Sequence, residues 1–428
     1  MANLPLFDLD TEKTIHVTGI PHKRIRAQYL DFKDVPASSG IYGIHPYPAM
    51  FHFLVVRELI EKYSFEGDLV LDPFMGSGVV AGECLVGGRN FVGYDINPLA
   101  ILVAQVRTTP IEHETLVEAL TEICEVFRLE KPEEVRFHNI DYWFDESTVQ
   151  QLSRLRKAVE RVKDGCVQRF FKVAFSETVR RVSRTDYNEF KLLRRKDSGG
   201  VSDVLKVFQD VSYKNIRLIT GFYRQHAPKM VKLHFEERNI AHDLALEDGS
   251  VDLVVTSPPY GDSRTTVAYG QFSRLSLRWL GLEERVDRES LGAKPKDITQ
   301  GLPSALLYQV IEGISSKDKK RAREVFGFYG DLYRAICFIA KKVKKNGTVC
   351  FVVGNRRVKG LELPTDKICA DFFVDQGFEH EKTLVRAISS KRMPLENAPS
   401  NVKGEKDATM HNEYIVLLKK VSLPSPET

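Results

Sequence analysis

The sequence contains few cysteines and no long apolar segment, and these absences exclude several classes of protein. Its 428 residues include only 6 cysteines, which are scattered and form no Cys-x-x-Cys pair. This pattern disfavours a structural metal site and predicts free, buried thiols in a reducing cytoplasm. No stretch of about 18 apolar residues occurs, so we expect no membrane-spanning helix. The first residues also lack the basic and apolar segments of a signal peptide. We therefore expect a cytoplasmic protein that binds neither metal nor membrane.

The chain as a whole has a small net charge, but positive charge is concentrated in one segment. The formal net charge is +4 at pH 7, yet residues 151–240 contain 21 Lys and Arg against 10 Asp and Glu. A basic segment on a mildly acidic remainder is typical of proteins that bind a polyanion. The alternative is that the basic helices are simply solvated, so the charge pattern needs support from motifs elsewhere.

A buried strand with an unusual end follows that segment. Residues 251–256 are mostly apolar or β-branched, which is typical of a parallel strand covered on both faces, and residues 257–260 are Ser-Pro-Pro-Tyr. The prolines lack N–H donors and end the strand, so carbonyl oxygens are left free beside an aromatic ring. Such acceptors suit a planar base that carries an exocyclic amino group. The alternative is an ordinary proline stop followed by a surface tyrosine.

A second motif indicates a nucleoside site. Residues 69–72 predict a strand that leads into a turn containing Gly76 and Gly78. A helix at 79–86 follows, and a second strand then ends at Asp95. This is the βαβ step of a doubly wound α/β fold, in which the glycines let the backbone approach a ligand and the acidic residue accepts from ribose hydroxyls. The last glycine of the dinucleotide fingerprint is absent, so the ligand need not be a dinucleotide.

Together, the two motifs resemble those of the exocyclic-amino DNA methyltransferases of restriction-modification systems, which use S-adenosyl-L-methionine. The segment 45–49, His-Pro-Tyr-Pro-Ala, resembles the family's loop over the methionine end of the cofactor, and 93–98 resembles its ribose-binding segment. The likeness covers residues 45–100 and 240–280. It implies a Rossmann-like, mostly parallel sheet with a basic helical insertion, in a prokaryotic enzyme that flips a base out of double-stranded DNA.

The resemblance also implies roles for particular residues. Family members with Ser before Pro-Pro-Tyr mostly modify N4 of cytosine, which is the function we favour. The alternatives are N6 of adenine, an amino group of guanine or adenine in RNA, and a non-catalytic DNA-binding subunit. The catalytic motif comprises Ser257, Pro258, Pro259 and Tyr260, and the cofactor site is expected to comprise Tyr47, Pro48, Asp72, Pro73, Phe74, Gly76, Gly78, Asp95, Ile96 and Asp243.

The order of the motifs predicts three regions. These are an N-terminal extension with the cofactor half (1–145), a basic helical insert for DNA recognition (146–235) and a catalytic half (236–428), in which residues 283–325 form a lid or a DNA-side insertion. The predicted partner is double-stranded DNA, and the resemblance allows a separately acting restriction endonuclease. The residues expected to contact DNA are Arg180, Arg181, Arg184, Arg194, Arg195 and Lys196 in the insert, and Lys391 and Arg392 in a basic loop near the C-terminus.

Overall fold

The structure is a computed structural model of the chain. It describes residues 16–17, 20–187, 189–195, 203–240, 244–261, 268–294, 296–299, 301–388, 396–397, 407–408 and 411–421. Within these ranges, no helix has the length and apolarity needed to cross a membrane. The same residues contain no cluster of three or more side chains suited to hold a metal ion.

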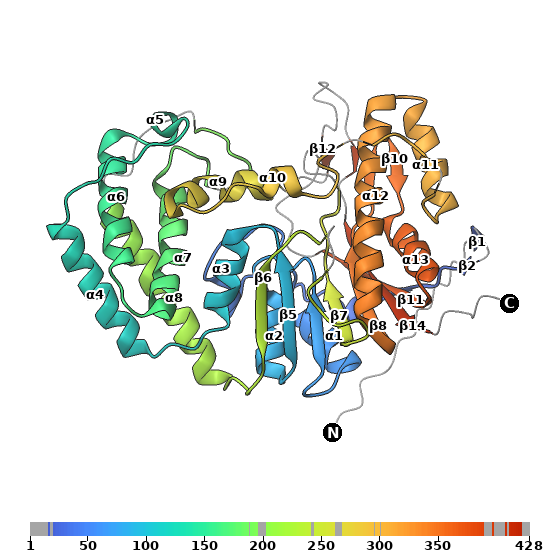
Figure 1. Cartoon of the computed structure of the whole chain (residues 1–428), viewed down its shortest axis with the longest axis horizontal. Coiled ribbons are helices and arrows are strands. Elements are labelled where there is room, and N and C mark those ends of the chain that lie inside the picture. Colours follow the sequence, from blue (N-terminus) through green and yellow to red (C-terminus); the bar gives the residue numbers. More distant parts are fainter. Residues whose placement is uncertain are drawn as a thin grey trace.

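An eight-stranded, mostly parallel sheet forms the centre of the molecule (Figure 1). Strands β8, β7, β4, β5 and β6 run parallel to one another, and β14 lies antiparallel between β8 and β11. The doubly wound fold predicted from the sequence is therefore confirmed. In spatial order the strands are β3 (Arg24–Arg26), β11 (Phe378–Ala387), β14 (Asn412–Lys420), β8 (Val343–Val353), β7 (Val251–Thr256), β4 (Leu69–Asp72), β5 (Asn90–Asp95) and β6 (Leu233–Glu237).

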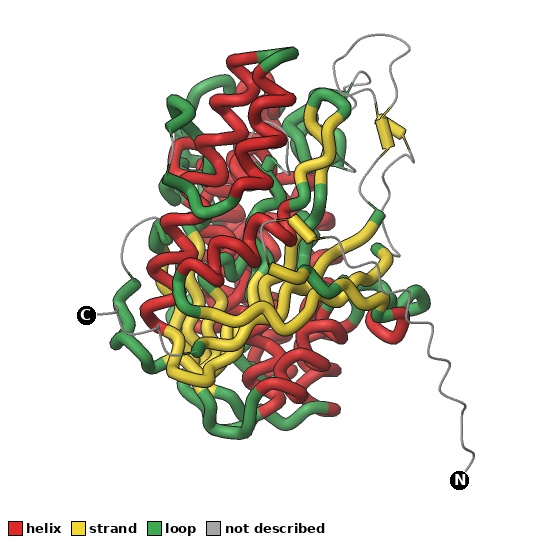
Figure 2. Tube along the Cα trace, turned by 90° about the vertical axis from the view of Figure 1, so that its right-hand side faces the viewer, coloured by secondary structure: helices red, strands yellow, loops and turns green. Residues whose placement is uncertain are grey.

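Helices cover both faces of this sheet, and in Figure 2 the strands form a twisted band with helices on either side. Successive side chains of a strand point to opposite faces, so Val70 and Leu71 of β4 belong to two different hydrophobic cores. This double burial explains why the strands are almost continuously apolar. One face is covered by α1 (Phe53–Tyr63), α2 (Val79–Gly87) and α3 (Pro98–Arg107), the other by α11 (Ala305–Ser315), α12 (Lys319–Lys342) and α13 (Thr365–Asp375).

A helical body extends the sheet on the side of α3, at the left of Figure 1. Three of its helices begin at an aspartate whose carboxylate accepts backbone N–H groups, namely Asp145, Asp164 and Asp203, which is the favoured N-terminal cap. The predicted boundaries 146–235 stay a prediction, because helices before and after that range pack into the same body. The body comprises α4 (His113–Leu129), α6 (Glu146–Glu160), α7 (Gly165–Val182), α8 (Val204–Gln225) and α9 (Tyr269–Leu280).

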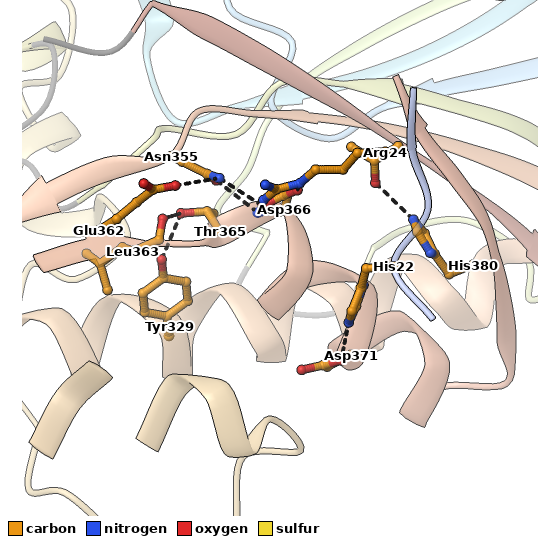
Figure 3. A network of polar contacts seen from close by, with 11 residues as sticks. His22, Arg24, Tyr329, Asn355, Glu362, Leu363, Thr365, Asp366, Asp371 and His380 are labelled. Carbon is orange, nitrogen blue, oxygen red and sulfur yellow. Dashed lines mark hydrogen bonds and ion pairs between the residues drawn. The ribbon is translucent and has the colours of Figure 1, made fainter. Parts of the chain in front are cut away.

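A polar network ties the first strand of the sheet to the C-terminal part of the chain (Figure 3). Arg24 of β3 donates two hydrogen bonds to Asp366 of α13, each 2.8 Å long. Asn355, in the short turn after β8, donates to the same carboxylate at 2.9 Å. The bidentate geometry fixes both the position and the direction of the guanidinium. Residues more than 340 positions apart in the sequence are thereby held at one edge of the sheet.

The turn between β4 and α2 leads to a first prediction. Gly78 has φ +76°, and a Cβ added there would lie 2.5 Å from the Cβ of Ala104. We expect Gly78→Ala to lower the free energy of unfolding by about 2–5 kcal/mol, since left-handed strain costs about 1–2 kcal/mol and overpacking about 1–3 kcal/mol. Gly67→Ala is the matched control, because Gly67 has φ +88° but no neighbour within 4 Å of its added Cβ. Equal decreases in the urea unfolding free energy of the two variants would contradict the role of the packing against Ala104.

Candidate active site

The carboxyl ends of three neighbouring parallel strands open into one pocket. Strands β4, β5 and β7 end at Asp72, Asp95 and Thr256, and ligands of doubly wound proteins bind in the crevice outside such strand ends. The predicted cofactor and catalytic residues that line the pocket are Tyr47, Pro48, Asp72, Pro73, Phe74, Gly76, Asp95, Ile96, Ser257 and Pro259. Segments that are distant in the sequence therefore meet at this pocket.

Asp95 holds the glycine turn in place. One of its carboxylate oxygens accepts from the backbone N–H of Gly76 at 2.8 Å, and the other accepts from the N–H of Asn97 at 2.8 Å. Burial raises the pKa of Asp95 to about 6. Each carboxylate oxygen has two lone pairs, so both oxygens retain the capacity to accept from a ligand hydroxyl in the pocket.

Asp72 connects the first motif to the second. Its side chain is 3% exposed, and its Oδ1 accepts from the hydroxyl of Thr256 at 2.6 Å and from the N–H of Phe74 at 3.2 Å. Burial raises the pKa of Asp72 to about 7. The position of the strand that carries Ser-Pro-Pro-Tyr is thus set directly by a residue of the glycine-turn motif.

The loop before α1 closes one side of the pocket. Tyr47 is buried, its hydroxyl accepts from the amide of Asn97 at 3.0 Å, and its ring stacks on Tyr269 with 6.1 Å between centroids. Asn97 also donates to Ser273 of α9 at 2.8 Å. Tyr269 lines the pocket, whereas the side chain of Phe272 is buried. A single asparagine thereby links the loop, the end of β5 and the helical body.

The Ser-Pro-Pro-Tyr motif contributes to the pocket wall, and its tyrosine is held by a hydrogen bond to another strand. Ser257 donates from its hydroxyl to the Tyr260 hydroxyl at 3.1 Å, and Tyr260 in turn donates to Glu413 of β14 at 3.1 Å. Ser257 and Pro259 line the pocket, while Pro258 is buried. The pocket-lining part of the motif therefore depends on a tyrosine that is fixed by a distant strand.

The arginines predicted to contact DNA have different environments. For Arg180 the structure corrects the prediction. Its side chain is 1% exposed, donates to the backbone carbonyl of Phe272 at 3.2 Å and lies over the ring of Phe272. Because it is enclosed between α7 and α9, it joins two helices and does not reach a phosphate. The sequence pattern cannot distinguish a buried arginine from an exposed one in a basic segment.

The other predicted DNA contacts are partly engaged within the helical body. Arg181 pairs with Glu177 at 2.6 Å, Arg184 donates to the carbonyl of Asp141, and Arg195 donates to the carbonyl of Ser183. Arg194 is exposed, and its guanidinium lies over the ring of Tyr142. The predicted residues Asp243, Lys196, Lys391 and Arg392 lie outside the described residues.

Several residues that line the pocket are not among the residues named individually from the sequence. Asn97 precedes Pro98 and caps α3 through its side chain, so the Asn-Pro pair was the available signal. Residues 286–291, which include α10 (Val286–Glu289), form another wall, although 283–325 was expected only to be a lid or a DNA-side insertion. Asn239 donates to the carbonyl of Glu289 at 3.2 Å and holds this segment against the end of β6. A short, charge-rich helix gives no local signal for such a position.

Comparison with known proteins decides the family. The family model of DNA methylases matches residues 10–105. The chain is 36% identical over 427 residues to the type II methyltransferase M.MvaI of Kocuria varians, with 92% of this chain and 94% of the relative covered. The chain belongs to the N4/N6 DNA methyltransferases of type II restriction-modification systems.

This methyltransferase has more distant relatives as well. It is 22% identical over 409 residues to the type II methyltransferase M.BsoBI of Geobacillus stearothermophilus, with 80% of this chain and 79% of the relative covered. A solved structure of a putative DNA modification methylase from Thermus thermophilus, in complex with S-adenosyl-L-methionine, aligns with 43% of this chain and 53% of its own at 16% identity and a TM-score of 0.21. The methyl donor of the methyltransferase is S-adenosyl-L-methionine, and its substrate is DNA.

The raised pKa of Asp72 makes the stability of the methyltransferase depend on pH. The ordinary value is 3.8 and the folded value about 7, so the folded protein retains a proton that the unfolded chain has released. The contribution of this carboxyl to stability is therefore fully present below about pH 4 and is lost as the pH rises through about 7. We expect the free energy of unfolding of the wild type, relative to Asp72→Asn, to fall between pH 4 and pH 8.

Urea unfolding at stepped pH measures this difference. Asparagine keeps an oxygen that accepts from Thr256, so the variant removes the titration while it preserves the hydrogen bond. Asp34→Asn, at an exposed position, is the matched control for the loss of a surface carboxyl group. A wild-type curve parallel to that of Asp72→Asn would contradict the raised pKa.

Proposed function

We propose that this methyltransferase transfers a methyl group to N4 of cytosine in double-stranded DNA. The observation that carries the proposal is Ser257, a pocket-lining hydroxyl where adenine-modifying members of the family usually have a carboxylate. A carboxylate is a stronger, charged acceptor than a hydroxyl, so the site works without that charge. Cytosine also has the smaller ring, and the aromatic side chain of Tyr269 takes up part of the pocket wall.

The pocket residues suit the chemistry of the methyl donor. The Asp95 carboxylate is placed to accept from ribose hydroxyls, and the apolar side chains of Ile96, Ile240, Val286 and Leu291 offer a surface for the adenine. Tyr47 and the glycine turn enclose the amino-acid end. When bound, S-adenosyl-L-methionine supplies an electrophilic sulfonium methyl group. The role of the protein is to hold that methyl group in line with the base.

The catalytic motif makes the base a better nucleophile. The exocyclic nitrogen is conjugated with its ring, so its lone pair is poorly available. Ser257 Oγ and the carbonyl of Pro258 accept hydrogen bonds from the amino group at two angles and draw the nitrogen towards tetrahedral geometry. The ring of Tyr260 stacks on the base. Fixed acceptors in a site that excludes water stabilise the charge developing on nitrogen, and positioning lowers the barrier further.

The base must leave the duplex to reach this site. Flipping costs a few kcal/mol, which contacts to the DNA backbone offset. We assign the phosphate contacts to the basic insert, 146–235, through its exposed positions such as Arg194, and to the basic loop containing Lys391 and Arg392. We further propose that the enzyme works in the cytoplasm beside a separate restriction endonuclease of the same specificity.

The identity of the base is tested by nucleoside mass spectrometry. DNA methylated by the purified enzyme, then digested to nucleosides, should contain N4-methyldeoxycytidine and no N6-methyldeoxyadenosine. DNA incubated with enzyme but without S-adenosyl-L-methionine is the control. A signal for N6-methyldeoxyadenosine alone would overturn the choice of base and leave the enzyme family unchanged.

The place of DNA binding is tested by its salt dependence. Replacing Arg194 and Arg195 with glutamine should reduce the slope of log affinity against log salt by up to about 0.9 for each phosphate that the variant no longer neutralises. The matched control replaces Lys344 and Lys345 with glutamine. These lysines lie at the start of β8, at the end of the sheet opposite the pocket. Equal slopes for the wild type and the Arg194/Arg195 variant would show that DNA binds to another surface.

A further inference from the structure

A row of three hydrogen-bonding groups leads outwards from the pocket. It begins at the Ser257 hydroxyl, which lines the pocket, continues through the Tyr260 hydroxyl at 3.1 Å, and ends at Oε1 of Glu413 at 3.1 Å. Each hydroxyl in the row donates to the next oxygen, so the direction runs from the pocket towards the carboxylate. The Ser257 hydroxyl keeps its lone pairs for an acceptor role on the side of the pocket.

The far end of this row is a fixed carboxylate at the protein surface. Arg386 of β11 pairs with Oε2 of Glu413 at 3.1 Å, and the Arg386 side chain is 4% exposed. Arg386 also donates to the carbonyl of Leu30 at 3.1 Å, so a second contact holds the arginine in place. Glu413 is 18% exposed. It is therefore held against Tyr260 on one side and in contact with solvent on the other.

We propose that Glu413 receives the proton that the amino nitrogen of the base loses during methyl transfer, by way of Tyr260 and Ser257. This inference rests on the proposed function, because it uses Ser257 as the hydroxyl that meets the amino group. The inference adds a proton acceptor on β14 to the Ser-Pro-Pro-Tyr motif at the end of β7. Burial raises the pKa of Tyr260 well above its ordinary value, so its hydroxyl is protonated and able to donate to Glu413.

The transfer balances without any further reactant. The amino nitrogen forms a bond to the methyl carbon while the carbon–sulfur bond breaks, and the electron pair of that bond stays on sulfur. The nitrogen now carries a positive charge and gives one proton to Ser257 Oγ. Ser257 passes its own proton to the Tyr260 oxygen, and Tyr260 passes its proton to Glu413. The products are a neutral methylamino base, a neutral thioether and a protonated Glu413, which releases its proton to solvent.

Two single variants and their combination test this relay. Glu413→Gln keeps an acceptor for Tyr260 and Arg386 but cannot take up a proton. Tyr260→Phe keeps a ring that stacks and leaves the pair of Glu413 with Arg386 intact. Each should slow single-turnover methyl transfer by about 100-fold, the lower end of what a positioned proton-transfer group contributes. Their affinity for S-adenosyl-L-methionine, measured by calorimetry, should stay at the wild-type value.

The double variant separates a relay from two independent roles. Groups that act in one chain show non-additive effects, so the double variant should be no slower than the slower single variant. Multiplied effects would overturn the relay. A wild-type rate for Glu413→Gln would also overturn it. Glu379→Gln, at an exposed position on the neighbouring β11, is the matched control and should react at the wild-type rate.

Chemical rescue distinguishes proton transfer from a structural role of Glu413. Formate, a small carboxylate, should restore much of the rate of Glu413→Ala, and chloride at the same ionic strength should not. A rate that stays low in formate would assign Glu413 a structural role and overturn the proposal. Ser257→Ala separates the two levels of inference. If Ser257→Ala is slow while Glu413→Gln is normal, only the relay fails, whereas a wild-type rate for Ser257→Ala removes the serine on which the proposed function rests.

Discussion

The hydrogen bond from Thr256 to Asp72 is the contact on which the organisation of this methyltransferase depends. It joins the last residue of β4 to the last residue of β7 at 2.6 Å, in a buried position where a broken hydrogen bond leaves a polar group without water. The residues after Asp72 form the glycine turn, and those after Thr256 form the Ser-Pro-Pro-Tyr motif. Since the two strands are parallel neighbours, this bond fixes the position of the two motifs relative to each other. A slip of one residue in either strand would turn one of the two partners to the other face.

The parts of the site that could be predicted are those with a local sequence signal. Gly76 and Asp95 belong to one βαβ unit. Its first strand, its glycine turn and the acidic residue that ends its second strand lie close together in the sequence. Ser-Pro-Pro-Tyr carries its own stop signal and its own aromatic ring. Glu413 carries no such signal, because its partner Tyr260 is 153 residues away in the sequence. The position of Glu413 beside Tyr260 follows from the spatial order of the strands in the sheet. Local patterns in the sequence do not reveal that order.

The basic segment shows why charge counts alone overestimate a binding surface. Glu177 of α7 is fully buried and pairs with both Arg181 and Lys214, and Arg180 is enclosed beneath α9. These charges are used to hold helices together, where each is compensated by a carboxylate, a carbonyl or an aromatic ring. The composition of residues 151–240 counts such groups equally with exposed ones such as Arg194. Burial is set by tertiary packing, so the sequence could indicate the polyanion partner but not the residues that meet it.

The position of β14 determines the order in which the molecule can be completed during synthesis. This last strand of the described sheet lies between β8 and β11, and within the described residues β3 joins the sheet through β11. Strand β3 therefore waits for strands that are synthesised much later. Until residues 412–420 emerge, β8 presents an open edge of unpaired backbone groups, which other chains can pair with. A chain that is truncated before this strand has an exposed sheet edge, and it also lacks the Glu413 carboxylate that accepts from Tyr260.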